Sequence, residues 1–255
     1  MNLAEKNFKV WSKEPFDKET TNEVYRLKEK LGQSEFNDIF HKDLEFGTGG
    51  MRGIMGTGPN RINKYSLGKT TQGICNFIND LKIKEPKVII GYDSRKNGKY
   101  LCDVVSDIFN ANNIRTYVFD EIKPTPIVSF GVRNLSCICG IVITASHNPP
   151  EYNGYKVYWS DGGQIVPPPI DKKLMSSISR TNYADINFQT NKNLKLTNYN
   201  EIEKEYFKKL GDYFKKIDIK KEKKKLKVVF TPIHGTSYKM IPSLLEDYGF
   251  EYKTV

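Results

Sequence analysis

The sequence has 255 residues, of which 38% are hydrophobic, and a formal net charge of +10. This composition is enough for one large domain, or for one domain and part of another. No apolar stretch reaches the roughly 20 residues that a membrane span needs, and residues 1–13 lack the apolar core of a signal peptide. We therefore expect a cytoplasmic protein without a membrane partner.

The positive charge is concentrated in one stretch of the chain. Residues 204–227 contain eleven lysines against four acidic side chains. A lysine-rich stretch without interleaved arginines or exposed aromatic platforms is typical of a solvated helix face or a linker rather than of a nucleic-acid groove. We expect no nucleic-acid partner.

Cysteine and histidine usage argues against redox and zinc chemistry. The four cysteines fall at predicted core positions, and Cys137-Ile138-Cys139 has the wrong spacing for a CxxC motif. We expect buried, reduced thiols. The three histidines are widely separated, so any metal ion would be bound by oxygen ligands.

The N-terminal half alternates between helices and strands. A helical segment at 20–41, interrupted at Gly32, precedes a glycine-rich loop at 46–53, and Ser66 is expected to cap a helix that extends to Leu81. The elements predicted next are a strand at 87–92, a helix at 99–112, a strand at 115–120, a helix at 126–134 and a strand at 140–144. This order predicts a parallel sheet with right-handed crossovers.

Consecutive parallel strands present their C-terminal ends at one edge of the sheet. The loops at 93–95, 123–126 and 144–156 should therefore converge. Alternating apolar residues at 155–159 and a turn at 161–163 predict an antiparallel hairpin with 164–166, at the edge of the sheet. The hairpin would return Lys156 toward the loop that precedes it.

The C-terminal part begins another α/β unit. A helix is expected at 202–214, a strand at 226–230, a helix at 240–248 and a strand from 251. One helix between two short strands buries too little apolar surface to fold alone, so we expect the chain to end inside a second domain. The expected units are a helical arm at 1–43, a first domain at 44–200 that carries the serine loop, a helix with a lysine-rich linker at 201–225, and the truncated start of a second, similar domain at 226–255.

Ser146 is the candidate nucleophile, because it follows a buried strand where open α/β sheets bind ligands. A hydrolase would need the Gly-x-Ser-x-Gly elbow, which the flanking residues do not supply, and His147 is poorly placed as the base of the serine beside it in the sequence. The alternative is that Ser146 carries a phosphate, with Lys156 and Arg52 as the fixed positive charges that stabilise its transfer. Taken singly, each cation would be read as an ordinary structural or surface residue.

The run from Thr144 to Lys156 resembles the phosphoserine loop of the α-D-phosphohexomutase superfamily, the phosphoglucomutases and phosphomannomutases. Residues 44–53 resemble the first active-site loop of the phosphoglucomutase and phosphopentomutase branch, and 91–95 resemble the strand-end motif between the two loops. The resemblance covers essentially the whole chain, although family members are much longer. It implies an α/β fold whose mixed, mainly parallel sheet is sandwiched by helices.

The resemblance also implies roles for particular residues. Ser146 would be the phosphorylated catalytic serine, whose phosphate contacts Mg²⁺. Arg52 and Lys156 would be the active-site cations, with Lys156 a candidate for proton transfer at the sugar hydroxyl. His147 and Asn148 would shape the loop and contact phosphate or substrate.

Three further residues complete the implied site. Thr144 would support the serine loop, and Gly50 would allow close approach of the backbone to phosphate, although glycines in this loop can equally serve only the turn. For Arg95, a structural salt bridge is as well supported as phosphate binding.

The implied activity is conversion of a sugar 1-phosphate to a sugar 6-phosphate, most plainly of glucose, through a bisphosphorylated sugar such as glucose 1,6-bisphosphate. Two alternatives stay open: a phosphopentomutase acting on ribose or deoxyribose phosphates, and a non-catalytic phosphate- or polyanion-binding module that uses the lysines at 220–225. The sequence lacks the family's Asp-x-Asp-x-Asp magnesium run, its Gly-Glu-x-Ser-Gly sugar loop and its C-terminal phosphate-binding loop. We therefore expect the 255-residue chain alone to be inactive; its sugar preference and oligomeric state are left open.

Overall fold

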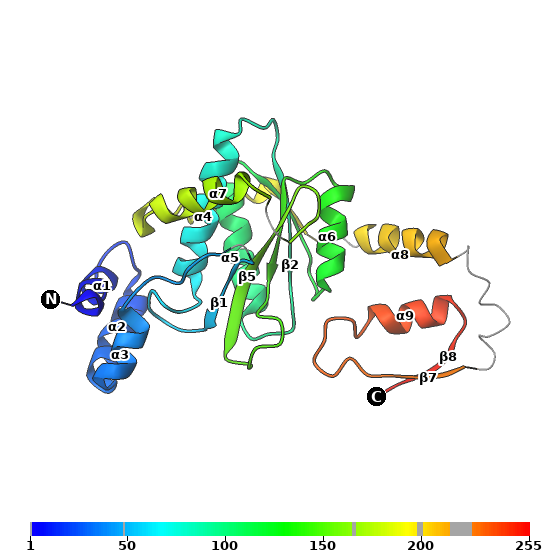
Figure 1. Ribbon diagram of the computed structural model, residues 1–255, viewed down its shortest axis with the longest axis horizontal. Helices are drawn as coiled ribbons and strands as arrows, with labels where there is room; N and C mark the ends of the chain where they lie inside the picture. The colour runs from blue at the N-terminus through cyan, green and yellow to red at the C-terminus, as the bar shows by residue number, and fades with distance from the viewer. Residues whose placement is uncertain (1, 48, 165–166, 198–200, 215–225) are drawn as a thin grey trace.

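A computed structural model describes residues 2–47, 49–164, 167–197, 201–214 and 226–255 (Figure 1). The lysines at 220–225 and residues 165–166 of the predicted hairpin lie outside the described residues. The helices are α1 (Leu3–Trp11), α2 (Lys18–Lys30), α3 (Gln33–Phe40), α4 (Lys64–Asp80), α5 (Gly98–Ala111), α6 (Thr125–Asn134), α7 (Ile170–Arg180), α8 (Glu201–Phe214) and α9 (Met240–Asp247). The strands are β1 (Met51–Ile54), β2 (Lys87–Tyr92), β3 (Arg115–Val118), β4 (Cys139–Ile143), β5 (Tyr152–Trp159), β6 (Lys195–Thr197), β7 (Lys227–Phe230) and β8 (Glu251–Thr254).

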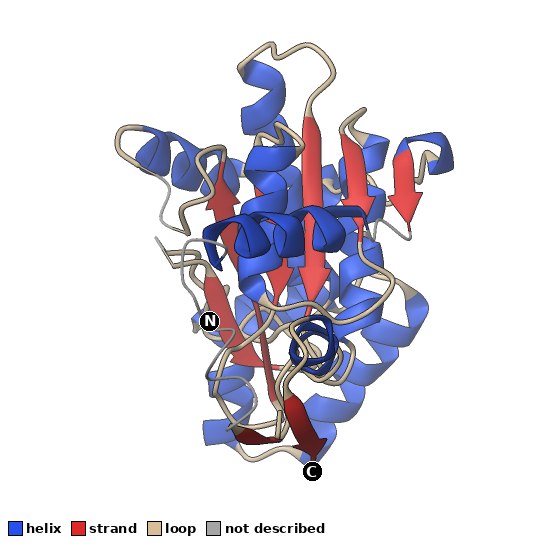
Figure 2. Ribbon diagram, turned by 90° about the vertical axis from the view of Figure 1, so that its right-hand side faces the viewer, coloured by secondary structure: helices blue, strands red, loops and turns tan. Residues whose placement is uncertain are grey.

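Six strands form the main sheet, in the order β1-β5-β4-β2-β3-β6. β2 pairs in parallel with β3 and β4, and β3 pairs in parallel with β6, whereas β5 is antiparallel to both β4 and β1. Helices cover the sheet on both faces (Figure 2), so the predicted mixed, mainly parallel α/β fold is confirmed. β7 and β8 pair in parallel as a separate two-stranded sheet.

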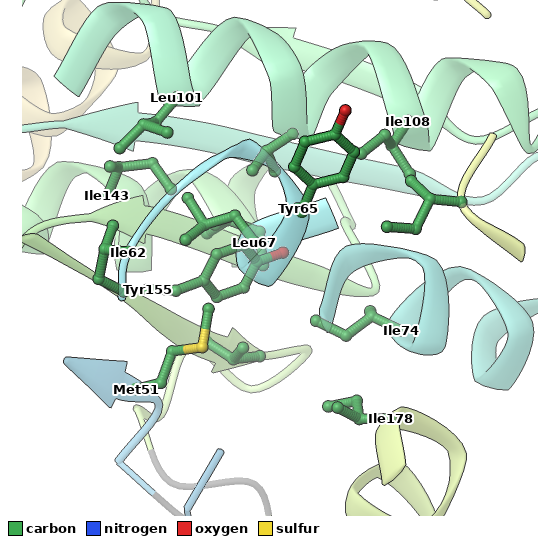
Figure 3. Close-up of a cluster of buried hydrophobic side chains, with 14 of the residues drawn as sticks. Met51, Ile62, Tyr65, Leu67, Ile74, Leu101, Ile108, Ile143, Tyr155 and Ile178 are labelled. Atoms are coloured by element: carbon green, nitrogen blue, oxygen red, sulfur yellow. The ribbon is translucent and has the colours of Figure 1, made fainter. Parts of the chain in front are cut away.

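Each face of the main sheet has its own hydrophobic core, because successive side chains of a strand point to opposite faces. Ile90 of β2 packs in the core that contains residues of α4, α5 and α7, part of which is drawn in Figure 3. Ile89 packs on the other face with Val128 of α6 and Ile202 of α8. Strands buried on both faces explain the continuous apolar runs of the sequence.

The N-terminal arm, α1 to α3, is attached to the domain through aromatic side chains. Trp11 is 1% exposed, stacks on Phe16 at 4.3 Å between ring centroids and meets Tyr65 of α4 edge-on at 5.8 Å. The predicted break at Gly32 is confirmed, since this residue is the N-cap of α3. α1 lies in the predicted helical arm but was not predicted as a helix of its own, because its polar sequence buries only Ala4 and Trp11.

The start of α4 differs from the prediction that Ser66 caps this helix. Asn63 is the cap, and its side-chain oxygen accepts hydrogen bonds from the backbone N–H groups of Tyr65 and Ser66 at 3.0 and 2.9 Å. The Ser66 hydroxyl accepts a hydrogen bond from the Asn63 N–H at 3.0 Å. Ser66 is therefore the third helical residue of a capping box that Asn63 opens.

The antiparallel strand after the serine loop is interior, which corrects the prediction of a hairpin at the sheet edge. β1, which the sequence indicated as part of a glycine-rich loop, occupies the edge and pairs with β5. Gly154 permits this packing, because a Cβ there would lie 2.5 Å from the Met51 carbonyl oxygen and 2.7 Å from that of Thr144. α7 and β6 were also missed, since they lie in polar sequence with few buried residues.

All four cysteines are buried and free, which confirms the expectation of buried, reduced thiols. Burial raises the pKa of Cys102 and Cys137 to about 12, so neither thiol is a ready nucleophile. No helix in the described part of the chain is long and apolar enough to cross a membrane.

Asp17 joins the arm to α4 and supplies a pH-dependent contribution to stability. Its carboxylate caps α2 at the Thr20 N–H and binds Lys64 and Tyr65. Burial alone would raise the pKa of Asp17, but these hydrogen bonds lower it overall from 3.8. The stabilisation is therefore present above pH 3.8 and is lost as the pH falls toward the lowered folded-state pKa.

We predict that Asp17→Asn, which keeps a capping side chain, lowers the free energy of unfolding by about 0.2–1 kcal/mol at pH 7, since the lost ion pair is partly exposed. Urea unfolding at a series of pH values checks this. The difference from the wild type should shrink below pH 3.8; a difference that stays constant through the acid range would contradict the assignment.

Candidate active site

A cleft of about 1240 Å³ opens where the loops after β2, β3 and β4 meet the loop after β7. The three loops that the sequence predicted to converge all line it, and the other wall is formed by 232–236. The predicted site residues in its lining are Thr144, Ser146, His147, Asn148 and Arg95. Gly50, Arg52 and Lys156 lie outside the lining, on the strand pair β1–β5 and the turn before it.

Ser146 is exposed at the mouth of the cleft in a left-handed backbone conformation, with φ of 58°. Its backbone N–H donates to the Thr144 hydroxyl at 2.9 Å, and that hydroxyl donates to Asp93 at the end of β2. A left-handed conformation costs a non-glycine residue roughly 1–2 kcal/mol. The Thr144 and Asp93 contacts hold Ser146 in this conformation.

Arg95 holds the serine loop from behind through backbone carbonyls. One terminal nitrogen donates to the carbonyls of Pro149 and Tyr152 at 2.7 and 2.9 Å, and the other donates to those of Ser146 and Asn148 at 2.8 and 2.5 Å. Only 11% of its side chain is exposed. Since both terminal nitrogens are engaged with the loop, the structure favours the structural alternative for Arg95 over phosphate binding.

His147 contacts Ser146. The Ser146 hydroxyl oxygen is 3.3 Å from Nδ1 of His147, which is within hydrogen-bonding distance. That His147 is poorly placed as the base of this serine stays a prediction. In the described structure, the side-chain oxygen of Asn148 is buried without a hydrogen-bond partner.

Arg52 and Lys156 lie on the sheet face that leads to the cleft. Lys156 pairs with Val142, which lines the cleft, and Arg52 pairs with Gly154, two residues before Lys156 on the same face. Burial lowers the pKa of Lys156, and the positive charge of Arg52 lowers it further, against an opposing effect of Asp93. A lowered pKa makes Lys156 a better proton acceptor near neutral pH.

Gly50 brings the segment before β1 onto β5. Its φ is 95°, and a Cβ at this position would lie 2.0 Å from the Tyr155 carbonyl oxygen and 3.1 Å from the Cα of Lys156. Both the conformation and the contact require glycine. Gly50 therefore sets the spacing between the Arg52 strand and the Lys156 strand.

The described residues do not make a magnesium site by themselves. No group of three histidine, cysteine, aspartate or glutamate side chains is gathered among them. Asp93, the carboxylate beside the serine loop, is engaged by Thr144 and lies 3.5 Å from the Nε of Arg95. An ion bound to a phosphate on Ser146 would need further oxygen ligands from elsewhere.

Sequence reasoning placed the loop 93–95 at this edge of the sheet but gave no role to Asp93 or Ser94. Both line the cleft, and Asp93 contacts Thr144 and Arg95. The available signal for their roles was the position of this run directly after a buried strand, where ligand-binding residues gather in open α/β sheets.

We predict that Gly50→Ala lowers the free energy of unfolding by about 1–3 kcal/mol, because the methyl group meets a backbone carbonyl and the conformation is strained. Gly49→Ala is the matched control, since nothing lies within 4 Å of a Cβ there. Urea unfolding of both variants checks this. Equal stabilities of the two variants would be incompatible with the close approach at Gly50.

We predict that Arg52→Gln raises the pKa of Lys156, because it removes a positive charge that lowers it. NMR titration of the side-chain amine in protein with ¹³C-labelled lysine checks this, with Lys156→Arg used to assign the signal. Arg115→Gln, at the start of β3 and exposed, should leave the pKa unchanged. If the pKa of Lys156 is the same in Arg52→Gln as in the wild type, the Arg52 charge does not lower it.

Comparison with known proteins agrees with this geometry. The family model described as phosphoglucomutase/phosphomannomutase, alpha/beta/alpha domain I, matches residues 43–185. A protein described as a probable phosphoribomutase from Schizosaccharomyces pombe is 34% identical over 94% of this chain and 42% of its own length. A phosphoglucomutase from Staphylococcus haemolyticus is 34% identical over 83% of this chain and 38% of its own length.

Solved structures show the same fold. One from Thermus thermophilus matches with a TM-score of 0.70 at 20% identity, over 83% of this chain and 45% of that one. A phosphoglucomutase/phosphomannomutase family protein from Burkholderia thailandensis matches with a TM-score of 0.61 at 21% identity, over 82% of this chain and 43% of that one. The chain spans about two fifths of the length of the curated relatives named above. With the serine loop, its supporting contacts and a family match over more than half of its residues, this chain belongs to the phosphoglucomutase/phosphomannomutase family, of which it contains domain I.

Proposed function

We propose that the chain is the N-terminal part of a phosphosugar mutase that interconverts a sugar 1-phosphate and a sugar 6-phosphate, with glucose as the sugar. The observation that carries the proposal is the Ser146 hydroxyl, exposed in a cleft on a loop that Arg95 and Asp93 hold from behind. Membership of the family supports a phosphosugar as the substrate. We also propose the units 1–43, 44–200, 201–225 and 226–255 as its arm, first domain, linker and second-domain start.

In the proposed reaction, a phosphoryl group passes from phosphorylated Ser146 to a sugar hydroxyl. The bond between phosphorus and the serine oxygen breaks and a bond to the sugar oxygen forms. The hydroxyl proton moves to a base, and a proton is returned to the serine oxygen, which becomes a hydroxyl again. Lys156 is the candidate base because its pKa is lowered. The guanidinium of Arg52 stabilises the transferred group.

The bisphosphorylated sugar then turns round, and its other phosphate returns to Ser146. The sugar bisphosphate is therefore both the intermediate and the activator that first phosphorylates the serine. A Mg²⁺ ion on the Ser146 phosphate would neutralise charge during transfer. Its remaining ligands, and the residues that read the sugar, would come from outside the described residues.

A phosphopentomutase is the second candidate. The Schizosaccharomyces pombe relative is described as a probable phosphoribomutase, and the alignment covers 94% of this chain. The two candidates share the serine chemistry and differ in the sugar. Comparing turnover of ribose 1-phosphate with that of glucose 1-phosphate by the complete protein distinguishes them.

We predict that Ser146→Ala abolishes turnover in the complete protein and prevents labelling by glucose 1,6-bisphosphate that carries ³²P, because the phosphate acceptor is lost. The matched control is Ser160→Ala, an exposed serine in the turn after β5, which should keep the wild-type rate. Near-normal turnover in the Ser146→Ala protein would exclude the phosphoserine route.

A further inference from the structure

The second α/β unit, residues 226–255, contacts the first domain at the rim of the cleft. The Ser94 hydroxyl donates to the backbone carbonyl of His234 at 2.7 Å. His234 belongs to the loop 232–236, which forms the wall of the cleft opposite the serine loop. The hydrogen bond therefore joins the two walls directly.

Two other contacts attach the same unit. Met240, at the start of α9, is 6% exposed and belongs to the hydrophobic cluster that contains Phe119 and Val128. The Lys239 ammonium lies 2.6 Å from the Glu121 carboxylate, with 55% and 40% of the two side chains exposed. An ion pair this exposed contributes little free energy, and apolar burial is not directional. The Ser94 hydrogen bond, although also exposed, adds a directional contact between the unit and the first domain.

Ser94 stands between the two residues that hold the serine loop. Asp93 accepts a hydrogen bond from Thr144, whose hydroxyl fixes the Ser146 backbone. Arg95 binds the carbonyl of Ser146 at 2.8 Å. Of these three successive side chains, two contact the serine loop and the third contacts the opposite wall.

We propose that Ser94 is a positioning residue that fixes the second α/β unit relative to the Ser146 loop. The turn 93–95 after β2 then positions both walls of the cleft, so a displacement of the serine loop also moves residues 232–236. The position of residues 226–255 relative to the first domain can be measured on this chain directly, whereas any consequence for turnover rests on the proposed function. A distance measurement therefore tests Ser94 independently of catalysis.

The experiment measures the distance between nitroxide labels on the two units by double electron–electron resonance. Labels are attached through Lys172→Cys in α7 and Lys253→Cys in β8, which are both exposed. The four native cysteines are buried, and burial raises the pKa of their thiols, so they do not compete for the label. Circular dichroism checks that each variant is folded.

We predict that Ser94→Ala increases the fraction of molecules outside the main distance peak roughly fivefold to tenfold, the effect of one net hydrogen bond. Ser94→Thr keeps a hydroxyl and should restore the narrow distribution. Ser160→Ala, exposed and away from the cleft lining, should leave the distribution unchanged.

A Ser94→Ala distribution as narrow as the wild type would overturn the assignment, and so would equal broadening by Ser160→Ala. Loss of turnover in the complete protein with an unchanged distance distribution would also count against positioning. A broadened distribution in a protein that lacks mutase activity would instead retain Ser94 as a positioning residue and reject the proposed function.

Discussion

The shape of the serine loop depends on one guanidinium, that of Arg95. Arg95 donates hydrogen bonds to four backbone carbonyls between residues 146 and 152. Only 11% of its side chain is exposed, so these hydrogen bonds are largely shielded from water. Charge-assisted hydrogen bonds of this kind are stronger than neutral ones and fix geometry as well as energy. The unusual conformation of Ser146 is tolerated because the loop on either side of it is held in this way.

Arg52 and Lys156 lie near each other because the backbones of β1 and β5 pack closely. Gly50 and Gly154 leave room for β1 to approach β5, which puts Arg52 beside the strand that carries Lys156. Burial lowers the pKa of Lys156, and repulsion by the nearby positive charge of Arg52 lowers it further. Such a pair is stabilised by an anion and destabilised without one, which fits a site that receives phosphate.

Local sequence patterns predicted the elements that are buried on both faces, such as β2 and β4, because burial on two faces leaves a continuous apolar run. They failed for β1, whose strand conformation depends on a distant glycine, Gly154, rather than on its own residues. The same limit applies in the site. Ser146 was picked out from its place after a strand and Thr144 from the family resemblance, but neither could predict that Thr144 binds Asp93, which is remote in the sequence, or that His147 lies 3.3 Å from the Ser146 hydroxyl.

The direction of the loop carbonyls has a consequence for the cleft. In a trans peptide the N–H of the next residue points opposite to the carbonyl, so the Ser146 carbonyl on Arg95 directs the His147 N–H away from that arginine. The Asn148 and Pro149 carbonyls also bind Arg95, but Pro149 and Pro150 follow them and carry no N–H. Three carbonyls of the loop thus point toward the Arg95 guanidinium, and two of the peptides they belong to carry no N–H. The His147 N–H, next to the serine hydroxyl, is directed away from Arg95, and this is the polarity that the proposed phosphate on Ser146 would require.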